Sequence, residues 1–325
     1  MNCQLYGIGN ALVDSEYLVS EPMLDQSGFK KGTMTLVDAH DRSKLITLLE
    51  DTNGVSLSKR AGGGSAANTI VTAALLGTEA FYNCKVASDP TGDFFVHDLI
   101  GLGIKTNMAG LRPEGVTGEC ISMITPDGER TLVTHLGING SLSSSNIDTA
   151  ALAAAKFLYI EGYLVSSESA FEAVLDAQRI ALENQVAVSL TLSDVGMVEN
   201  FRDQFDLLVQ RGVDLIFCNE EEAKLWTRTD DRLDAANALA NQGSRFAMTL
   251  SGDGAYVSGE DETPCFVSAD KVQALDTTGA GDTFAGAVLS GLIGGESLPT
   301  ATSKGHDLAR TVVSRFGARL LPSDL

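Results

Sequence analysis

The chain has 325 residues, 44% hydrophobic and 20% charged, and its 43 acidic and 23 basic side chains give a formal net charge of −20. This composition supports a large buried core, while the negative charge argues against nucleic acid and anionic lipid as partners. No apolar stretch approaches the ~20 residues that cross a bilayer, and the five cysteines form no CxxC pair, which is usual for reduced thiols. We therefore expect a cytoplasmic protein, monomeric or homodimeric, with no membrane segment and no nucleic-acid partner.

The first half of the chain contains both helical and strand-like stretches. Two of the strand-like stretches flank the sequence Pro126-Asp127-Gly128, which predicts a hairpin turn. Segments within 10–38 and 105–138 do not fit a helix–strand alternation, and we expect them to form a small β-rich lid with apolar residues such as Leu12 and Met123. The predicted elements are strands over 3–9, 12–19 and 34–37, a helix over 39–50, a glycine-rich turn over 62–68 leading into a helix over 69–76, a strand over 81–87, a helix over 92–102, and hairpin strands over 119–125 and 131–136.

From residue 150 onward, apolar strands alternate regularly with helices. This pattern predicts a mostly parallel sheet that is covered by helices on both faces. We therefore expect a single three-layer α/β/α domain over residues 1–325, with the lid as an addition. The predicted elements are strands over 157–160, 186–192, 213–218 and 246–250, helices over 169–183, 198–209 and 233–241, an edge hairpin at 256–258 and 266–268, and closing helices over 279–292 and 300–316.

Several common catalytic and nucleotide-binding motifs are missing. The sequence contains no Gly-Lys dipeptide and therefore no Walker A loop. Gly7 and Gly9 begin a dinucleotide-binding pattern whose third glycine is absent. The four histidines are too scattered for an HExxH zinc site, and the stretch that begins at Gly63 lacks the last glycine of a nucleophile elbow. These absences disfavour P-loop enzymes, Rossmann oxidoreductases and hydrolases.

The most informative stretch is DTTGAGDTF at 276–284, where a small flexible loop runs into an apolar helix. The first amides of a helix have no intrahelical acceptor, and glycines let an anion approach them closely. We therefore predict an anion hole made by the backbone of Gly279, Ala280 and Gly281. Asp282 would then lie beside the bound anion, where a carboxylate can take a proton from an attacking hydroxyl. Gly-Ala-Gly-Asp alone leaves an ordinary acidic helix N-terminus about equally open.

The whole of this stretch resembles the C-terminal signature of the ribokinase-like (PfkB) kinases, and other segments agree with that family in order along the chain. The resemblance implies a three-layer α/β fold and an ATP-dependent transfer of the γ-phosphate to a hydroxymethyl group of a small ribose-containing acceptor. It implies ATP and Mg²⁺ as cofactors. It further implies that Asp282 is the catalytic base, with Gly279, Ala280 and Gly281 around the transferred phosphate.

Two N-terminal segments resemble the family's acceptor site. The stretch GGSAAN at 63–68 is similar to its glycine pair followed by asparagine, which implies that Gly63, Gly64 and Asn68 hold acceptor hydroxyls. The stretch from Asn10 to Asp14 resembles the early strand whose aspartate binds a sugar diol, and a carboxylate offers two acceptors to two hydroxyl donors. The alternative for Asp14 is a solvated charge at a strand end.

Two later segments resemble the family's nucleotide site. Asn219 and Glu222 match its Asn-x-x-Glu, which implies contact with the triphosphate and magnesium ordered largely through water. The alternative is an acidic helix N-terminus. The stretch TLSGDG at 249–254 resembles the nucleotide loop and implies ATP contacts from Thr249, Ser251, Gly252 and Gly254, although a serine replaces the usual first glycine. A plain β-turn is the alternative there.

Two further residues have roles only by resemblance. Asp276 corresponds to a family position that helps to hold a monovalent cation such as K⁺. Arg130, in the hairpin sequence DGERT at 127–131, would move onto the phosphates when the lid closes, and a guanidinium suits that role. The alternative for Arg130 is an exposed hairpin arginine.

The acceptor is the least determined part of the interpretation. The sequences GNALVD at 9–14, DGERT at 127–131 and YIEGY at 159–163 are similar to the adenosine-kinase-like branch, which implies a nucleoside such as adenosine with Tyr163 against its base. Tyr163 can equally be a core residue. A sugar kinase for ribose or fructose is the alternative, and a sugar phosphate is disfavoured because the sequence shows no cluster of lysine and arginine. A non-catalytic nucleotide-binding protein is disfavoured because Asp282 and the glycines are intact.

Overall fold

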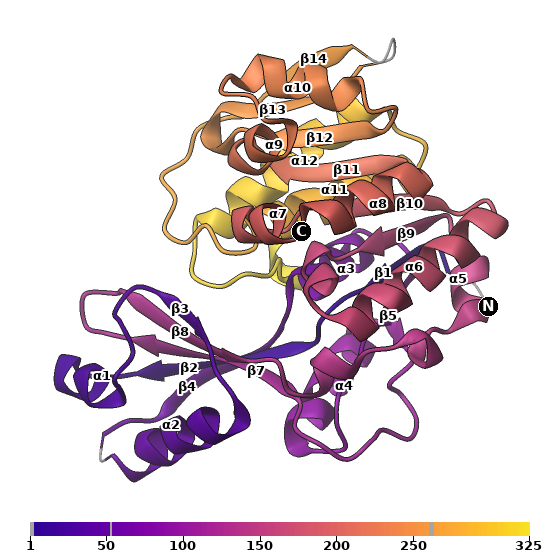
Figure 1. Cartoon of the computed structure of the whole chain (residues 1–325). Helices are drawn as coiled ribbons and strands as arrows, with labels where there is room; N and C mark the ends of the chain where they lie inside the picture. The colour runs from indigo at the N-terminus through magenta and orange to yellow at the C-terminus, as the bar shows by residue number, and fades with distance from the viewer. Residues whose placement is uncertain (1–2, 53, 260–262) are drawn as a thin grey trace.

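The computed structural model describes residues 3–52, 54–259 and 263–325, and it contains two sheets (Figure 1). The larger sheet has nine strands, parallel except for the antiparallel strands at one edge. Its order is β14 (Pro264–Ser268), β13 (Gly254–Ser258), β12 (Arg245–Thr249), β11 (Leu215–Asn219), β10 (Ala187–Thr191), β9 (Phe157–Ile160), β1 (Leu5–Ile8), β5 (Ala80–Asn83) and β6 (Lys105–Thr106).

Helices cover both faces of this sheet, as the regular alternation predicts. Successive strand residues point to opposite faces, so Tyr6 and Ile8 join the core on one side while Leu5 joins the core on the other. One face is covered by α5 (Thr149–Ala153), α6 (Glu168–Glu183), α7 (Val195–Asn200), α8 (Arg202–Gly212), α9 (Glu220–Thr227) and α10 (Arg232–Ala240). The other face is covered by α3 (Ser65–Leu75), α4 (Pro90–Gly101), α11 (Ala280–Ile293) and α12 (Leu298–Val313).

The smaller sheet has five strands and projects from the nine-stranded sheet (Figure 1). Two short helices, α1 (Glu21–Ser27) and α2 (Ala39–Asp51), bury one of its faces. Met123, one of the apolar residues expected in the lid, belongs to that buried face and points away from the opposite face of the sheet, since alternate strand residues point to opposite sides. The strand order is β3 (Met34–Leu36), β8 (Arg130–His135), β7 (Gly118–Ile124), β2 (Leu12–Leu18) and β4 (Leu57–Gly63).

The structure corrects three of the predicted elements. The edge strand β4 lies outside the segments 10–38 and 105–138 that were expected to form the lid. The first half of β4 is exposed and contains charged residues, so it lacks the hydrophobic alternation that would reveal a strand. Helix α3 begins at Ser65 rather than at residue 69. The predicted helix over 198–209 is two helices, α7 and α8, and α9 follows β11 without a loop.

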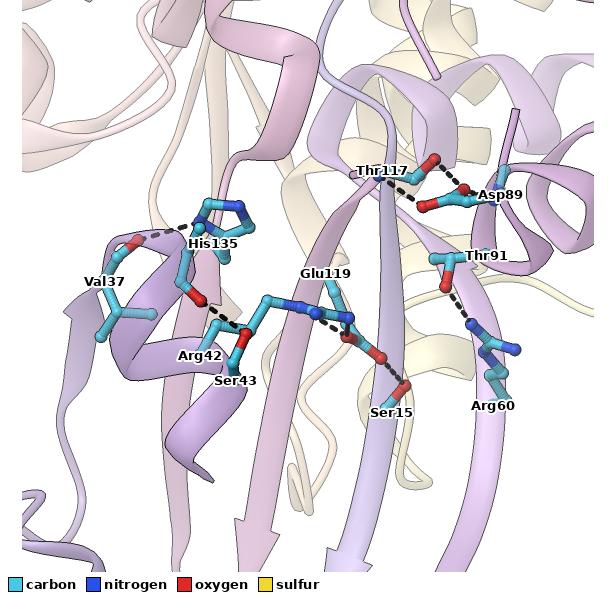
Figure 2. A network of polar contacts seen from close by, with 12 residues as sticks. Ser15, Val37, Arg42, Ser43, Arg60, Asp89, Thr91, Thr117, Glu119 and His135 are labelled. Atoms are coloured by element: carbon cyan, nitrogen blue, oxygen red, sulfur yellow. Dashed lines mark hydrogen bonds and ion pairs between the residues drawn. The ribbon is translucent and has the colours of Figure 1, made fainter. Parts of the chain in front are cut away.

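Buried polar contacts hold the smaller sheet together and tie it to the body of the protein (Figure 2). Glu119 on β7 accepts a hydrogen bond from the Ser15 hydroxyl at 2.7 Å and pairs with Arg42 of α2 at 2.5 Å. Where β7 leaves the body, the Asp89 carboxylate at the start of α4 accepts hydrogen bonds from both the N–H and the hydroxyl of Thr117. The end of β7 is therefore fixed to the N-terminus of α4. In the part of the chain that the structure describes, no helix is both long and apolar enough to cross a membrane.

Candidate active site

Two helix N-termini, those of α3 and α11, meet at the center of the site. Each helix follows a glycine in the left-handed region, Gly64 with φ 97° and Gly279 with φ 77°. A side chain at Gly279 would collide with the carbonyl of Ala318, so this position requires glycine for both its dihedral angle and its space. Further along α11, Gly286 allows the two helices to pack closely, because a Cβ there would collide with the carbonyl of Thr69.

Asp282 lies in the first turn of α11 and is held by two side chains of α3. The Ser65 hydroxyl donates to Oδ1 at 2.7 Å, and the Asn68 Nδ2 donates to Oδ2 at 2.9 Å. Burial raises the pKa of Asp282 to about 6, although these hydrogen bonds oppose the shift. A carboxylate with this pKa is ionised at neutral pH and is still a competent proton acceptor.

The early start of α3 explains this arrangement. Ser65 and Asn68 are three residues apart on a helix, so they lie on the same side of it. The sequence prediction placed both in a turn and assigned no role to Ser65. The position of Ser65 directly after the glycine pair could nevertheless have indicated a role, because a serine at the first position of a helix can direct its hydroxyl toward a neighbouring anion.

A cavity of about 240 Å³ brings Asp282 together with three of the residues predicted to bind nucleotide and magnesium, Asn219, Thr249 and Glu222. We call it the Asp282 cavity. Gly281 enters it from the first turn of α11, and Asn219, Glu222 and Thr249 enter from the ends of β11 and β12. No lysine or arginine is among the described residues that line it. Ala280 already donates its N–H to the Thr277 carbonyl at 3.3 Å, so the Gly281 amide is the better placed donor to an anion.

Asn219 and Glu222 bind each other in a capping box at the start of α9. The Asn219 side chain accepts from the Glu222 N–H at 2.9 Å, and Glu222 accepts from the backbone N–H of Asn219 at 3.0 Å and from its amide at 2.6 Å. Burial raises the pKa of Glu222 to about 7. Both predicted roles are compatible with this geometry, since the pair caps a helix and also lines the Asp282 cavity.

These residues suit a magnesium ion that is held mainly by phosphate and water. Within the described ranges, no three His, Cys, Asp or Glu side chains are grouped as a metal site. The Asp282 cavity nonetheless contains two carboxyl groups, that of Asp282 and the buried one of Glu222, and no basic residue among its described lining to balance a triphosphate. Magnesium keeps several waters and needs few protein ligands, so Glu222 could hold it through water.

The loop after β12 contains two residues with positive φ. Ser251, at the position of the usual glycine, has φ 53° in the left-handed region, which is uncommon for a residue with a side chain. Gly254 has φ 132°, and a Cβ there would collide with the carbonyl of Val267. Thr249 lines the Asp282 cavity, whereas Ser251, Gly252 and Gly254 do not. Their contact with ATP stays a prediction.

A second cavity, of about 370 Å³, lies between the smaller sheet and the body of the protein. We call it the Asp14 cavity. Asp14 on β2 faces Gly63 on β4, where a Cβ would collide with the carboxylate. Burial raises the pKa of Asp14 to about 6, against the opposing charges of Arg319 and Arg130. The aspartate is therefore a partly buried group in the cavity wall rather than a solvated strand end.

The fold brings to the Asp14 cavity a group of basic side chains that are scattered in the sequence: Lys59, Arg60, Arg130, Arg315 and Arg319. Three of the arginines already have carboxylate partners. Arg130 pairs with Glu16 at 3.2 Å, Arg315 pairs with Asp324 at 2.6 Å, and Arg319 pairs with Asp98. The charges of these three arginines are therefore balanced by neighbouring carboxylates, while Lys59 and Arg60 add two further basic side chains to the wall of the cavity.

Arg130 connects the smaller sheet to the loop before α11. Its guanidinium lies 3.6 Å from the Asp276 carboxylate and 5.4 Å from the center of the Phe316 ring, and its side chain is 22% exposed. It is thus not a free hairpin arginine. Asp276 also accepts hydrogen bonds from the N–H groups of Thr278 at 3.0 Å and Gly317 at 3.1 Å. A monovalent cation would have to share this carboxylate with Arg130, and its presence stays a prediction.

Five of the six predicted acceptor residues line neither cavity: Asn10, Gly63, Gly64, Asn68 and Tyr163. The Asn10 N–H donates to the buried carboxyl group of Glu161, and its carbonyl accepts from the Tyr82 hydroxyl at 2.6 Å. The Tyr163 hydroxyl lies 3.5 Å from the carbonyl of Ser193. Of the described residues around the Asp14 cavity, Phe94 on α4 is the aromatic one.

Sequence reasoning also missed Arg319, whose side chain is 10% exposed. Its Nε donates to the Asn68 Oδ1 at 2.7 Å, and it forms part of the wall of the Asp14 cavity. No local motif marks this residue, because its side-chain partners lie more than two hundred positions earlier in the chain.

Comparisons with known proteins agree with this arrangement. The model of the pfkB family carbohydrate kinases matches residues 34–324. The adenosine kinase of Saccharomyces cerevisiae is 26% identical over 334 residues, which cover 98% of this chain and 96% of the yeast protein. The ribokinase of Staphylococcus aureus is 27% identical over 268 residues, covering 80% of this chain and 84% of that protein.

Two solved structures are similar over nearly their whole length. The adenosine kinase from Sinorhizobium meliloti superposes with a TM-score of 0.86 at 34% identity, covering 99% of this chain and 97% of that one. A probable sugar kinase protein from Rhizobium etli superposes with a TM-score of 0.84 at 34% identity, covering 98% of this chain and 95% of that one.

Proposed function

The chain belongs to the pfkB family of carbohydrate kinases and is a kinase, and on that premise we propose that it transfers the γ-phosphate of ATP to the hydroxymethyl group of a nucleoside such as adenosine. The observation that carries the proposal is the position of Asp282. This partly buried carboxylate is hydrogen-bonded to the N-terminal turn of α3 and lines the cavity that also contains Asn219, Thr249 and Glu222. Its partner Asn68 is bonded in turn to Arg319, which lines the Asp14 cavity.

The two cavities divide the substrates between them. ATP would occupy the Asp282 cavity, with its γ-phosphate at the N-terminus of α11, where the Gly281 amide and the helix dipole favour negative charge. The acceptor would occupy the Asp14 cavity. The two oxygens of Asp14 can accept hydrogen bonds from two neighbouring ribose hydroxyls, and Gly63 leaves room for them beside the carboxylate.

The reaction needs one proton transfer and one displacement. Asp282 takes the proton of the acceptor hydroxyl as its oxygen attacks the γ-phosphorus. The bond from that phosphorus to the bridging oxygen breaks, and ADP leaves with the electron pair. Magnesium, when bound, neutralises charge on the phosphates. The chain supplies orientation, the Gly281 amide as a donor to the transferred group, and the base.

The apolar part of the Asp14 cavity favours a nucleoside over a free sugar. Phe94, Val71, Leu132 and Leu320 line this part, and a nucleobase would cover it, since stacking on an aromatic ring contributes ~1–3 kcal/mol. We propose Phe94 rather than Tyr163 as the ring beside the base. A ribose or fructose acceptor, as in the sugar kinases of the same family, would leave this surface uncovered apart from the Arg60 guanidinium, which lies 5.0 Å from the center of the Phe94 ring.

We propose that the smaller sheet acts as a lid. Asp14, Cys120, Ser122 and Leu132 lie on the face that lines the Asp14 cavity, so closing this sheet would exclude water from the reacting groups and limit wasteful hydrolysis of ATP. Arg130, at the edge of this face, would then contribute a positive charge near the phosphates.

Steady-state kinetics with adenosine, inosine, ribose and fructose test the acceptor assignment. We expect kcat/KM for adenosine or inosine to exceed that for either free sugar. A higher kcat/KM for ribose or fructose than for both nucleosides would replace the nucleoside proposal by the sugar-kinase alternative. ADP release that no acceptor stimulates would contradict phosphotransfer itself.

A further inference from the structure

Four side chains from four separate segments form one continuous line of hydrogen bonds that ends at Asp282. Asp98 on α4 pairs with the Nη1 of Arg319 in the C-terminal segment. The Arg319 Nε donates to the Asn68 Oδ1 at 2.7 Å, and the Asn68 Nδ2 donates to Asp282 at 2.9 Å. The bond between Asn68 and Asp282 is therefore linked to a charged residue that does not itself contact the base.

The chemistry of the guanidinium decides which way the Asn68 amide points. Arginine has hydrogen-bond donors and no acceptor, so only the carbonyl oxygen of Asn68 can face it. The NH₂ group of Asn68 must then face Asp282. An N–H donor stabilises the ionised carboxylate more than the protonated acid, because the anion is the stronger hydrogen-bond acceptor.

Without Arg319 this constraint disappears. An asparagine amide is nearly symmetric in shape, so Asn68 could turn over and present its oxygen to Asp282. That oxygen can accept a hydrogen bond only from the protonated acid, which has an O–H. Loss of Arg319 also removes a positive charge that favours ionisation of Asp282. Both changes would make the acid form more stable and the base weaker.

Arg319 is itself rigidly held. Its side chain is 10% exposed and its carbonyl accepts from the Arg315 Nη2 at 2.5 Å. The next residue, Leu320, is 1% exposed and anchors the segment in the core. A buried guanidinium that is paired with Asp98 and oriented on both sides can direct the Asn68 amide without a further loss of side-chain entropy.

We propose that Arg319 is a positioning residue that fixes the orientation of the Asn68 amide and thereby keeps Asp282 ionised and ready to accept a proton. This inference rests on the proposed role of Asp282 as the base. The other titratable groups that influence the site lie on different elements and do not change in the test: Tyr159, Glu161 and Tyr163 on and after β9, and Glu222 on α9.

The pH dependence of kcat tests the proposal. In the full chain, acceptor-dependent ADP formation should fall below about pH 6 as Asp282 becomes protonated. This fall is the acid limb of the pH profile. In Arg319→Met, which keeps the length of the side chain and removes the donors and the charge, this limb should move upward by about one pH unit. Arg319→Lys keeps the charge and one donor direction and should return the limb toward its original position. The control is Arg310→Met, which removes an exposed arginine that pairs with Asp270 and Asp307 and should leave the limb unchanged.

The possible results distinguish the positioning role of Arg319 from the role of Asp282 as the base. A loss of turnover in Arg319→Met without movement of the limb would mean that Arg319 is only structural, and would overturn the inference. Full turnover in Asp282→Asn would instead contradict the role of the base. If Arg319→Met does not fold, side-chain amide NMR of the wild-type protein decides the matter. We expect the NH₂ protons of Asn68 to shift with the ionisation of Asp282, whereas protons that do not shift would place the oxygen toward Asp282 and overturn the inference.

Discussion

Ser65 and Asp282 are separated by 217 positions in the sequence, and their side chains are 2.7 Å apart in the structure. The first turn of α3 therefore supports the first turn of α11 through a direct hydrogen bond. Asp282 is oriented by this bond and by Asn68 before any substrate binds. Such preorganisation lowers the reorganisation that the chemical step requires.

Glu222→Gln should separate the two roles of the Asn219–Glu222 pair. Glutamine can still form the capping box, so α9 should keep its N-terminal cap, while the negative charge beside the phosphates is lost. We expect the magnesium concentration at half-maximal rate to rise roughly tenfold, as with other outer ligands of metals. Magnesium titrations of the rate measure this directly. An unchanged titration would leave Glu222 with a capping role alone.

Phe94→Ala should discriminate between acceptors. If a nucleobase stacks on this ring, kcat/KM for adenosine should fall by a factor of about 5 to 150, which corresponds to ~1–3 kcal/mol. The value for ribose should change little, because a free sugar does not reach the ring. Tyr163→Leu serves as the matched variant and should preserve the adenosine-to-ribose ratio. The reverse result, a ratio that changes only in the Tyr163 variant, would restore the interpretation made from the sequence.

Glu161→Gln should stabilise the protein at alkaline pH. Burial raises the pKa of Glu161 to about 8 from an ordinary value of 4.5, so the folded state binds a proton that the unfolded state has released. The stability from this group is therefore fully present below about pH 4.5 and is lost as the pH rises through 8. Urea unfolding at pH 5 and pH 8.5 should show the wild-type protein losing stability more steeply than the variant.

The control for that measurement is Glu172→Gln, at an exposed position on α6, which should follow the wild-type protein at both pH values. An equal pH dependence in wild type and Glu161→Gln would mean that Glu161 is already ionised in the folded state. The backbone N–H of Asn10, which donates to Glu161, would then outweigh burial.

Much of the fold could be predicted because its strands and helices have regular hydrophobic patterns. The parallel strands β9 to β12 are largely buried apolar runs, as expected for strands with both faces covered. β4 could not be found in this way, since Lys59 and Arg60 lie on an edge strand that contributes few buried side chains. The lid was therefore predicted without one of its strands.

The same contrast applies to the site. Asp282 and Gly279 could be identified because their roles arise within one loop and the helix that follows it. Arg319 could not, because its role depends on Asn68 and Asp98 on two other helices. Phe94 was missed for the same reason: an aromatic residue on α4 lines the proposed acceptor cavity only after the smaller sheet has folded beside that helix.

The central claim, that Asp282 is the base of a kinase, is tested most directly by Asp282→Asn. The amide keeps the size of the side chain and can still accept from Ser65, but it cannot take a proton. Acceptor-dependent ADP release should fall by a factor of ~10²–10⁴, the usual contribution of general-base catalysis, while equilibrium binding of ATP should persist. Turnover near the wild-type value with intact ATP binding would contradict the assignment of the base.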